Sequence, residues 1–106
     1  MGVRRGLSIT ITAADTDTLI ANIPKTKVAV IPLIEIRNPT ASTARIRIWD
    51  KYTIGTTAYS DLKADYDVPA GETVVIDTKE AKHAVNQLVA QSTVAGVTLY
   101  VGIDLT

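Results

Sequence analysis

The sequence has no cysteine and no phenylalanine, and a single histidine, tryptophan and methionine in 106 residues. Without cysteine there are no disulfides and no thiolate ligands or nucleophiles, and one histidine excludes a multi-histidine metal centre. No apolar run approaches the roughly 18 residues of a membrane-spanning helix. Eleven basic and eleven acidic residues cancel, leaving no basic surplus for nucleic acid. We expect no cofactor, no nucleic-acid partner and no membrane partner.

Motifs that support catalysis are also missing. The six glycines are scattered singly, so no phosphate-binding loop is formed, and no serine stands in a Gly-x-Ser-x-Gly frame. The one histidine, His83, lies among Lys79, Glu80 and Lys82, which favours an exposed side chain over a general base. We therefore predict that the protein is not an enzyme and has no catalytic or metal-binding residues.

Isoleucine, valine and threonine dominate what is present. These β-branched residues are stiff at the first side-chain torsion and pack well on a pleated sheet. The length is that of one domain. Asparagine, glutamine, methionine and cysteine are scarce, which fits a thermostable protein.

Apolar and polar residues alternate in several short segments, and this pattern predicts half-buried strands. The clearest are residues 7–11, 43–50, 73–77 and 97–105, and turn signals stand at 38–42, 69–72 and 94–96. Six to eight short strands with turns at roughly 8–12-residue spacing indicate an antiparallel β-sandwich, either jelly-roll or immunoglobulin-like, spanning residues 7–106.

Two segments depart from this alternation. Residues 51–67 are polar and predict a long loop, with a short strand around 63–68. Asp77 and Glu80 have capping-box spacing, and apolar residues follow at helical intervals. We predict one short helix from Thr78 to about Val85, followed by a strand. The competing interpretation is a strand from Gln87 to Ser92.

The most hydrophobic segment, Val28 to Ile36, is apolar on both faces, and Pro32 within it indicates a bulge or an edge. A strand that is apolar on both faces should be covered on both sides or lie at a subunit contact. We therefore predict a homo-oligomer in which Val30 and Ile34 bind the partner copy.

The N-terminal segment, residues 1–6, has two glycines and little apolar surface, so we predict a flexible arm that becomes ordered against a partner. Arg4 and Arg5 could pair with acidic groups there. Leu7, Ile9 and Ile11 would follow as a strand added to a sheet edge, in this molecule or the next.

Four of the five aromatic residues lie between positions 49 and 66. They could form a ligand platform for sugars, although core or loop packing is the simpler interpretation. The acidic residues Asp61, Asp65 and Asp67 could likewise hold calcium or only line a solvated loop. The platform residues would be Trp49, Tyr52, Tyr59 and Tyr66.

The order of elements over residues 34–40, 44–50, 68–77 and 94–101 is strand, Asn-led turn, strand, Pro-Ala-Gly-Glu turn and closing strand. This order resembles the small β-sandwich structural proteins of tailed viruses, which decorate capsids or sit in tails. The resemblance implies a virion location and a non-enzymatic protein that decorates or cements an assembled shell. It also implies a capsid or tail protein as partner and a homo-oligomer, with a trimer favoured. A carbohydrate-binding or adhesin-type module is the alternative.

Overall fold

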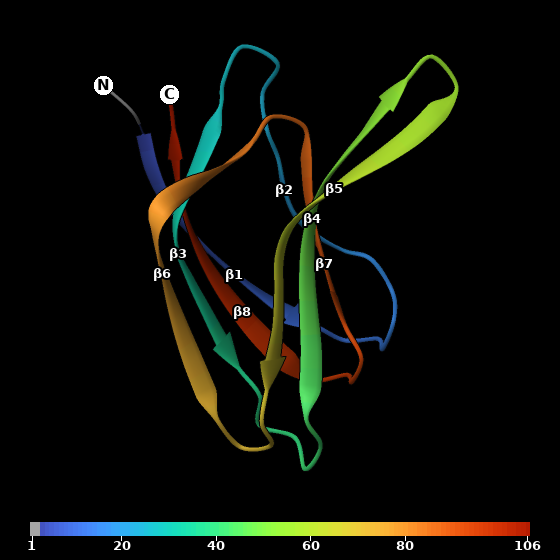
Figure 1. Cartoon of the computed structure of the whole chain (residues 1–106), viewed down its shortest axis with the longest axis vertical. Helices are drawn as coiled ribbons and strands as arrows, with labels where there is room; N and C mark the ends of the chain where they lie inside the picture. The colour runs from blue at the N-terminus through green and yellow to red at the C-terminus, as the bar shows by residue number, and fades with distance from the viewer. Residues whose placement is uncertain (1–2) are drawn as a thin grey trace.

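The computed structural model describes residues 3–106, with side chains for all of these except 3–5 and 77–82. The described residues form eight strands, joined by turns and loops, and no helix (Figure 1). The strands are β1 (Val3–Ile11), β2 (Thr18–Asn22), β3 (Ala29–Arg37), β4 (Ala44–Ile54), β5 (Thr57–Val68), β6 (Thr73–Ala84), β7 (Gln87–Ser92) and β8 (Val97–Leu105).

The strands form two four-stranded antiparallel sheets, in the orders β1-β8-β3-β6 (sheet A) and β2-β7-β4-β5 (sheet B). Counted inward from the two ends of the chain, the strands pair as β1 with β8, β2 with β7, β3 with β6 and β4 with β5. The chain is therefore one long hairpin, with its tip between β4 and β5, rolled up into two layers. This is the jelly-roll topology, one of the two sandwich types that the sequence predicts.

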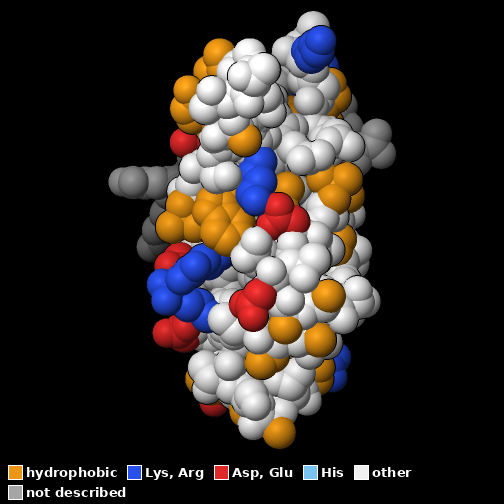
Figure 2. All heavy atoms as spheres, turned by 90° about the vertical axis from the view of Figure 1, so that its right-hand side faces the viewer, with side chains coloured by type: hydrophobic (Ala, Val, Ile, Leu, Met, Phe, Trp, Pro, Cys, Tyr) orange, Lys and Arg blue, Asp and Glu red, His pale blue; other side chains and the backbone are white. Residues whose placement is uncertain are grey.

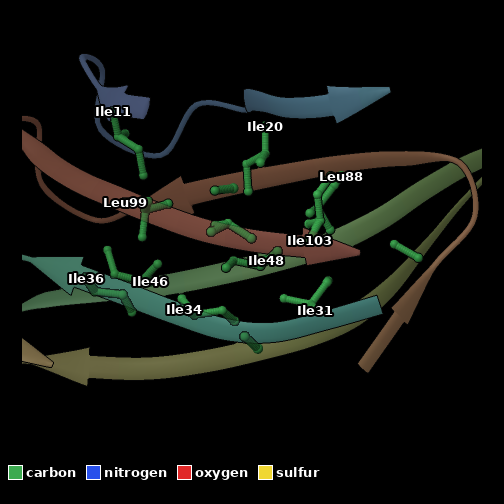
Figure 3. Packing of buried hydrophobic residues seen from close by; sticks show 14 of the residues in the cluster. Ile11, Ile20, Ile31, Ile34, Ile36, Ile46, Ile48, Leu88, Leu99 and Ile103 are labelled. Carbon is green, nitrogen blue, oxygen red and sulfur yellow. The ribbon is translucent and has the colours of Figure 1, made fainter. Parts of the chain in front are cut away.

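The core lies between the two sheets and is built mainly from isoleucine, valine, leucine and alanine. Side chains from both sheets point toward one another in this layer (Figure 3). The alternation predicted for β4 and β8 is confirmed, because every second residue of these strands is buried from Ala44 to Asp50 and from Val97 to Ile103. The largest fully buried hydrophobic side chains are Ile11, Ile31, Ile34, Ile36, Ile46, Ile48, Leu88, Leu99, Val68, Val97 and Val101.

The predicted helix is wrong, and the segment is a bulged part of β6. Leu33 of β3 pairs with Asp77 and Ile31 pairs with Lys82, so only Pro32 of β3 stands opposite residues 78–81. Proline has no N–H to donate to a ladder, so strand pairing is interrupted at Pro32. The bulge expected at Pro32 is thus confirmed. Pairing with β3 on both sides of it keeps the segment extended despite its helical spacing.

The predicted long loop over 51–67 is also wrong. Residues on both sides of a tight turn pair from Ile54 with Thr57 to Ala44 with Val68, with one register shift at Lys63, and Gly55 takes a positive φ of 63° in the turn. Figure 1 shows this hairpin extending past the rest of the sandwich. Its outer part has solvent on both faces, so no apolar alternation is required there and the sequence shows none.

Two buried polar side chains fasten turns to the sandwich. Asn38 donates from Nδ2 to the carbonyl oxygens of Ser42 (2.7 Å) and Val68 (3.0 Å), joining the turn after β3 to the end of β5. The carboxylate of Asp50 accepts the backbone N–H groups of Val85 (3.0 Å) and Asn86 (3.1 Å) in the β6–β7 turn. Buried polar atoms are thereby satisfied, which avoids a cost of about 1–3 kcal/mol for each unpaired group.

The predicted N-terminal arm requires a correction. Residues 3–6 belong to β1, which pairs with β8 from Val3 opposite Leu105 to Ile11 opposite Val97. Residues 1–2 lie outside the described residues. The strand expected at residues 7–11 therefore begins earlier and adds to an edge of its own molecule, because β8 supplies a partner for the whole of β1.

Candidate functional site on the outer face of sheet B

A row of apolar side chains crosses the outer face of sheet B. Leu19 of β2 pairs with Val89 of β7, Val89 pairs with Trp49 of β4, and Trp49 pairs with Leu62 of β5. The two ends of the row are exposed, 47% at Leu19 and 54% at Leu62, whereas Val89 is covered. We call these four residues the apolar row.

The row depends on a bulge that turns Leu62 outward. Ala64 and Val68 face the core, so strict alternation along β5 would place Leu62 on the core side as well. Ile48 pairs with Ala64 and Trp49 with Leu62, which leaves Lys63 as an extra residue in β5. A bulge of this kind re-aims the side chains beyond it. Leu62 consequently joins Trp49 on the outer face.

Charged groups beside the row are already paired within the molecule. Lys51 places its Nζ 5.3 Å from the centre of the Trp49 ring and 2.6 Å from Oδ2 of Asp17. Gln91 donates from Nε2 to the other carboxylate oxygen of Asp17 at 2.5 Å. Figure 2 views the molecule from the side of sheet B and shows hydrophobic side chains with basic and acidic ones among them.

A second ion pair lies on the same face, between neighbouring strands. Arg45 of β4 binds both carboxylate oxygens of Asp65 on β5, at 2.9 and 2.8 Å. Such parallel hydrogen bonds fix the geometry of both side chains. Arg45 also lowers the pKa of the Asp65 carboxyl, mainly through its hydrogen bond and further through its positive charge. The face therefore presents an apolar centre flanked by charges that neutralise one another.

Lys51 holds the pKa of the Asp17 carboxyl below its usual value, mainly by its hydrogen bond, with Gln91 adding to the effect. Because the folded-state pKa is the lower one, this interaction stabilises the fold above the ordinary carboxyl pKa and is lost as the pH falls through the folded value. We expect Lys51→Met to raise the pKa of Asp17 toward its ordinary value, as followed by NMR titration of the carboxyl carbon. Lys25→Met, in an exposed turn, is the matched control. An Asp17 pKa unchanged by Lys51→Met would contradict the pairing.

The four aromatic residues proposed as a platform do not share one surface. Tyr52 and Tyr59 stack on each other, with ring centres 5.4 Å apart and planes at 15°. Alternation along β4 places Tyr52 on the opposite side of the hairpin from Trp49, and Tyr66 packs against the core. The sequence showed that these residues are close along the chain, but the strand faces separate them.

The residues that the sequence analysis predicted to bind a partner do not lie on the outer face of sheet B. Ile11 and Ile34 are in the core, at 0% and 1% exposure, so their side chains are covered within the single molecule. Leu7 and Ile9 are half-buried and pack against the core. Val30 is half-buried on the outer side of β3. Strands β8 and β6 flank β3, and sheet B covers its inner face, which explains why this inner face is apolar. The side chains of Arg4 and Arg5 lie outside the described residues.

Other candidate sites are less developed. Asp61, Asp65 and Asp67 lie in strand β5, and no three His, Cys, Asp or Glu side chains among those described are grouped to hold a metal ion. His83 is exposed, as its charged neighbours predicted. A shallow hollow of about 260 Å³ on the outer face of sheet A is lined by Ser8, Glu35, Arg37, Thr98 and Tyr100.

No helix in the described part of the chain could cross a membrane.

The sequence was also compared with known proteins. It matches no protein-family model, and no curated protein is significantly similar to it.

Proposed function

We propose that this chain is a non-enzymatic virion structural protein, most concretely a capsid decoration or cementing protein that binds an assembled shell. The observation that carries the proposal is the apolar row, which exposes Leu19 and Leu62 to solvent on the outer face of sheet B. Exposed apolar side chains gathered on one face, with polar groups around them, are typical of protein–protein contact sites.

The charges of this face suit burial against another protein. Interface centres are depleted in charged residues, and a buried charge that loses its partner costs several kcal/mol. Here Asp17 is held by Lys51 and Asp65 by Arg45, so docking would not require new partners for them. The partner surface that fits is therefore apolar at its centre and close to neutral.

The row is small beside the roughly 800 Å² that each partner buries in a standard interface. A single contact would accordingly be weak. A shell repeats the same surface many times, and linked copies bind with higher avidity because later contacts form at high effective concentration. A small, neutral docking face is thus compatible with firm attachment to a lattice.

The jelly-roll topology supports the proposal only by analogy. The same topology occurs in viral capsid proteins, in lectins and in cupins, and a fold alone does not assign a function. The analogy is consistent with the resemblance of the strand and turn order to small virion proteins. The apolar row is therefore the specific argument for the proposed function.

Mass spectrometry of purified virus particles tests the proposal. We expect the chain in particles from cultures that express it, at a constant ratio to the main shell protein. The chain should be released by mild denaturant before the shell disassembles. Its absence from particles of an expressing culture would contradict the proposed function.

The carbohydrate-binding alternative retains one specific observation, which is the Trp49 ring with Gln91 at a diagonal position of the same face, opposite Arg47. Aromatic faces suit sugar rings, but Lys51 stands over this ring. Glycan-array binding that is lost in Trp49→Ala would favour this alternative. Our proposal expects no binding to the array.

A further inference from the structure

We propose that strand β1 pairs edge to edge with β1 of a second copy, antiparallel and around a two-fold axis at Ser8. Sheet A of each molecule would then continue into sheet A of the other. This inference concerns a different surface from the apolar row, and it does not depend on the proposed function.

Of the four edge strands, three are protected against such pairing. Strand β2 has only five residues and a register shift between Leu19 and Ala21. Strand β5 contains the bulge at Lys63 and three aspartates, and β6 contains the bulge opposite Pro32. Short length, bulges and charged side chains are the usual means of preventing edge-to-edge association.

Strand β1 has none of these protections between Gly6 and Ile11. Its nine residues pair with β8 in unbroken register, and no charged residue or proline occurs from Gly6 onward. Among the described strands none pairs with its other edge. A regular edge that is uncharged from Gly6 to Ile11 presents unpaired backbone groups to another strand.

The backbone geometry shows which groups face this edge. Val28 and Thr106 exchange both backbone hydrogen bonds, at 3.1 and 3.0 Å, so the even-numbered residues of β8 face β3 and the odd-numbered ones face β1. The odd-numbered residues of β1 therefore bond to β8. The carbonyl of Ile11 agrees, since it accepts the N–H of Gly96, just before β8, at 2.7 Å. Gly6, Ser8 and Thr10 consequently direct their N–H and C=O groups to the free edge.

A two-fold axis at Ser8 satisfies these groups in pairs. Ser8 would stand opposite Ser8 of the second copy, and Gly6 opposite Thr10. Leu7 would stand opposite Ile9 twice, on the face that is continuous with the core. Leu7 and Ile9 are only half-buried in the single molecule, so pairing would cover more of both. In this register Arg5 stands opposite Ile11, which keeps like charges apart.

The expected species in solution is a dimer, in place of the trimer that the family resemblance implies. Light scattering after size-exclusion chromatography should give twice the chain mass, 22.6 kDa from 11.3 kDa per chain. Ser8→Pro should convert the dimer to a folded monomer, because the lost N–H faces the free edge and takes no part in the β1–β8 ladder. A wild-type monomer or trimer would overturn the proposal.

Cysteine cross-linking tests the register without relying on proline, since the natural chain has no cysteine. Facing residues in a hydrogen-bonded antiparallel pair lie about 5.5 Å apart at Cα, within reach of a disulfide. Ser8→Cys should therefore form covalent dimers under mild oxidation. Thr10→Cys is exposed on the same strand face, but its two copies would lie about 14 Å apart, so it should not form them. Equal cross-linking of both variants, or none with Ser8→Cys, would contradict the paired edge.

Discussion

Replacing Ile34 by alanine is expected to lower the free energy of unfolding by about 2–5 kcal/mol. Its side chain is 1% exposed and lies in the layer between the two sheets, so the substitution leaves a cavity that the surrounding residues can only partly fill. A domain of this size has a total stability of roughly 5–15 kcal/mol. Chemical denaturation of the variant should therefore show a large decrease in the midpoint.

Val30→Ala is the matched control, because Val30 belongs to the same strand and is half-buried on the outer side of the sheet. We expect it to cost about 1 kcal/mol or less, since fewer contacts are lost. The opposite pattern, in which Ile34→Ala keeps its stability but changes the oligomeric state, would restore the subunit contact that the sequence suggested for this strand.

The sequence predicted the sandwich because burial imposes a period of two on most strands. Ile46 and Ile48 alternate with Arg45 and Arg47, and the structure places the two sets on opposite faces of sheet B. Strand order was beyond the sequence, because it depends on contacts between segments as distant as β1 and β8. Alternation along one strand contains no information on which strand lies beside it.

The two segments predicted wrongly share a physical cause. Between 51 and 62 the hairpin leaves the sandwich, so neither face has to be apolar and the signal for a strand disappears. Between 78 and 81 the helical spacing is a local preference, and pairing of β6 with β3 before and after the bulge overrides it. Local propensity is a weak predictor where tertiary pairing decides.

The sequence contains the residues of the candidate site, but only the structure shows that they lie side by side. Trp49 follows the buried Ile48 in β4 and therefore faces the opposite side of the sheet. Its neighbours Leu19, Val89 and Leu62 come from three other strands, and their alignment follows from the strand register. Leu62 also depends on the bulge at Lys63, and the sequence has no signal for it there, because neither glycine nor proline occurs from Asp61 to Asp65.

A negative charge at the end of the apolar row is expected to abolish docking while leaving the fold intact. Leu62 is 54% exposed, so Leu62→Asp removes few core contacts. In a docked complex the new carboxylate would be desolvated beside Trp49 without a partner, and this is unfavourable. We expect the affinity for a shell to fall at least about 30-fold, or roughly 2 kcal/mol, the size of a hot-spot effect.

Val75→Asp provides a closely matched control, since Val75 is 60% exposed and lies on sheet A, away from the row. Both variants introduce the same charge at an exposed apolar position. Their thermal midpoints should both remain near that of the wild-type protein.

Co-sedimentation with virus particles stripped of this chain tests the central claim most directly, because it measures docking by the outer face of sheet B. We predict that the wild-type protein and Val75→Asp sediment with the particles and saturate at the same level, whereas Leu62→Asp stays in the supernatant. Equal binding of Leu62→Asp and wild type, or equal loss with Val75→Asp, would contradict the claim that the apolar row is the docking surface.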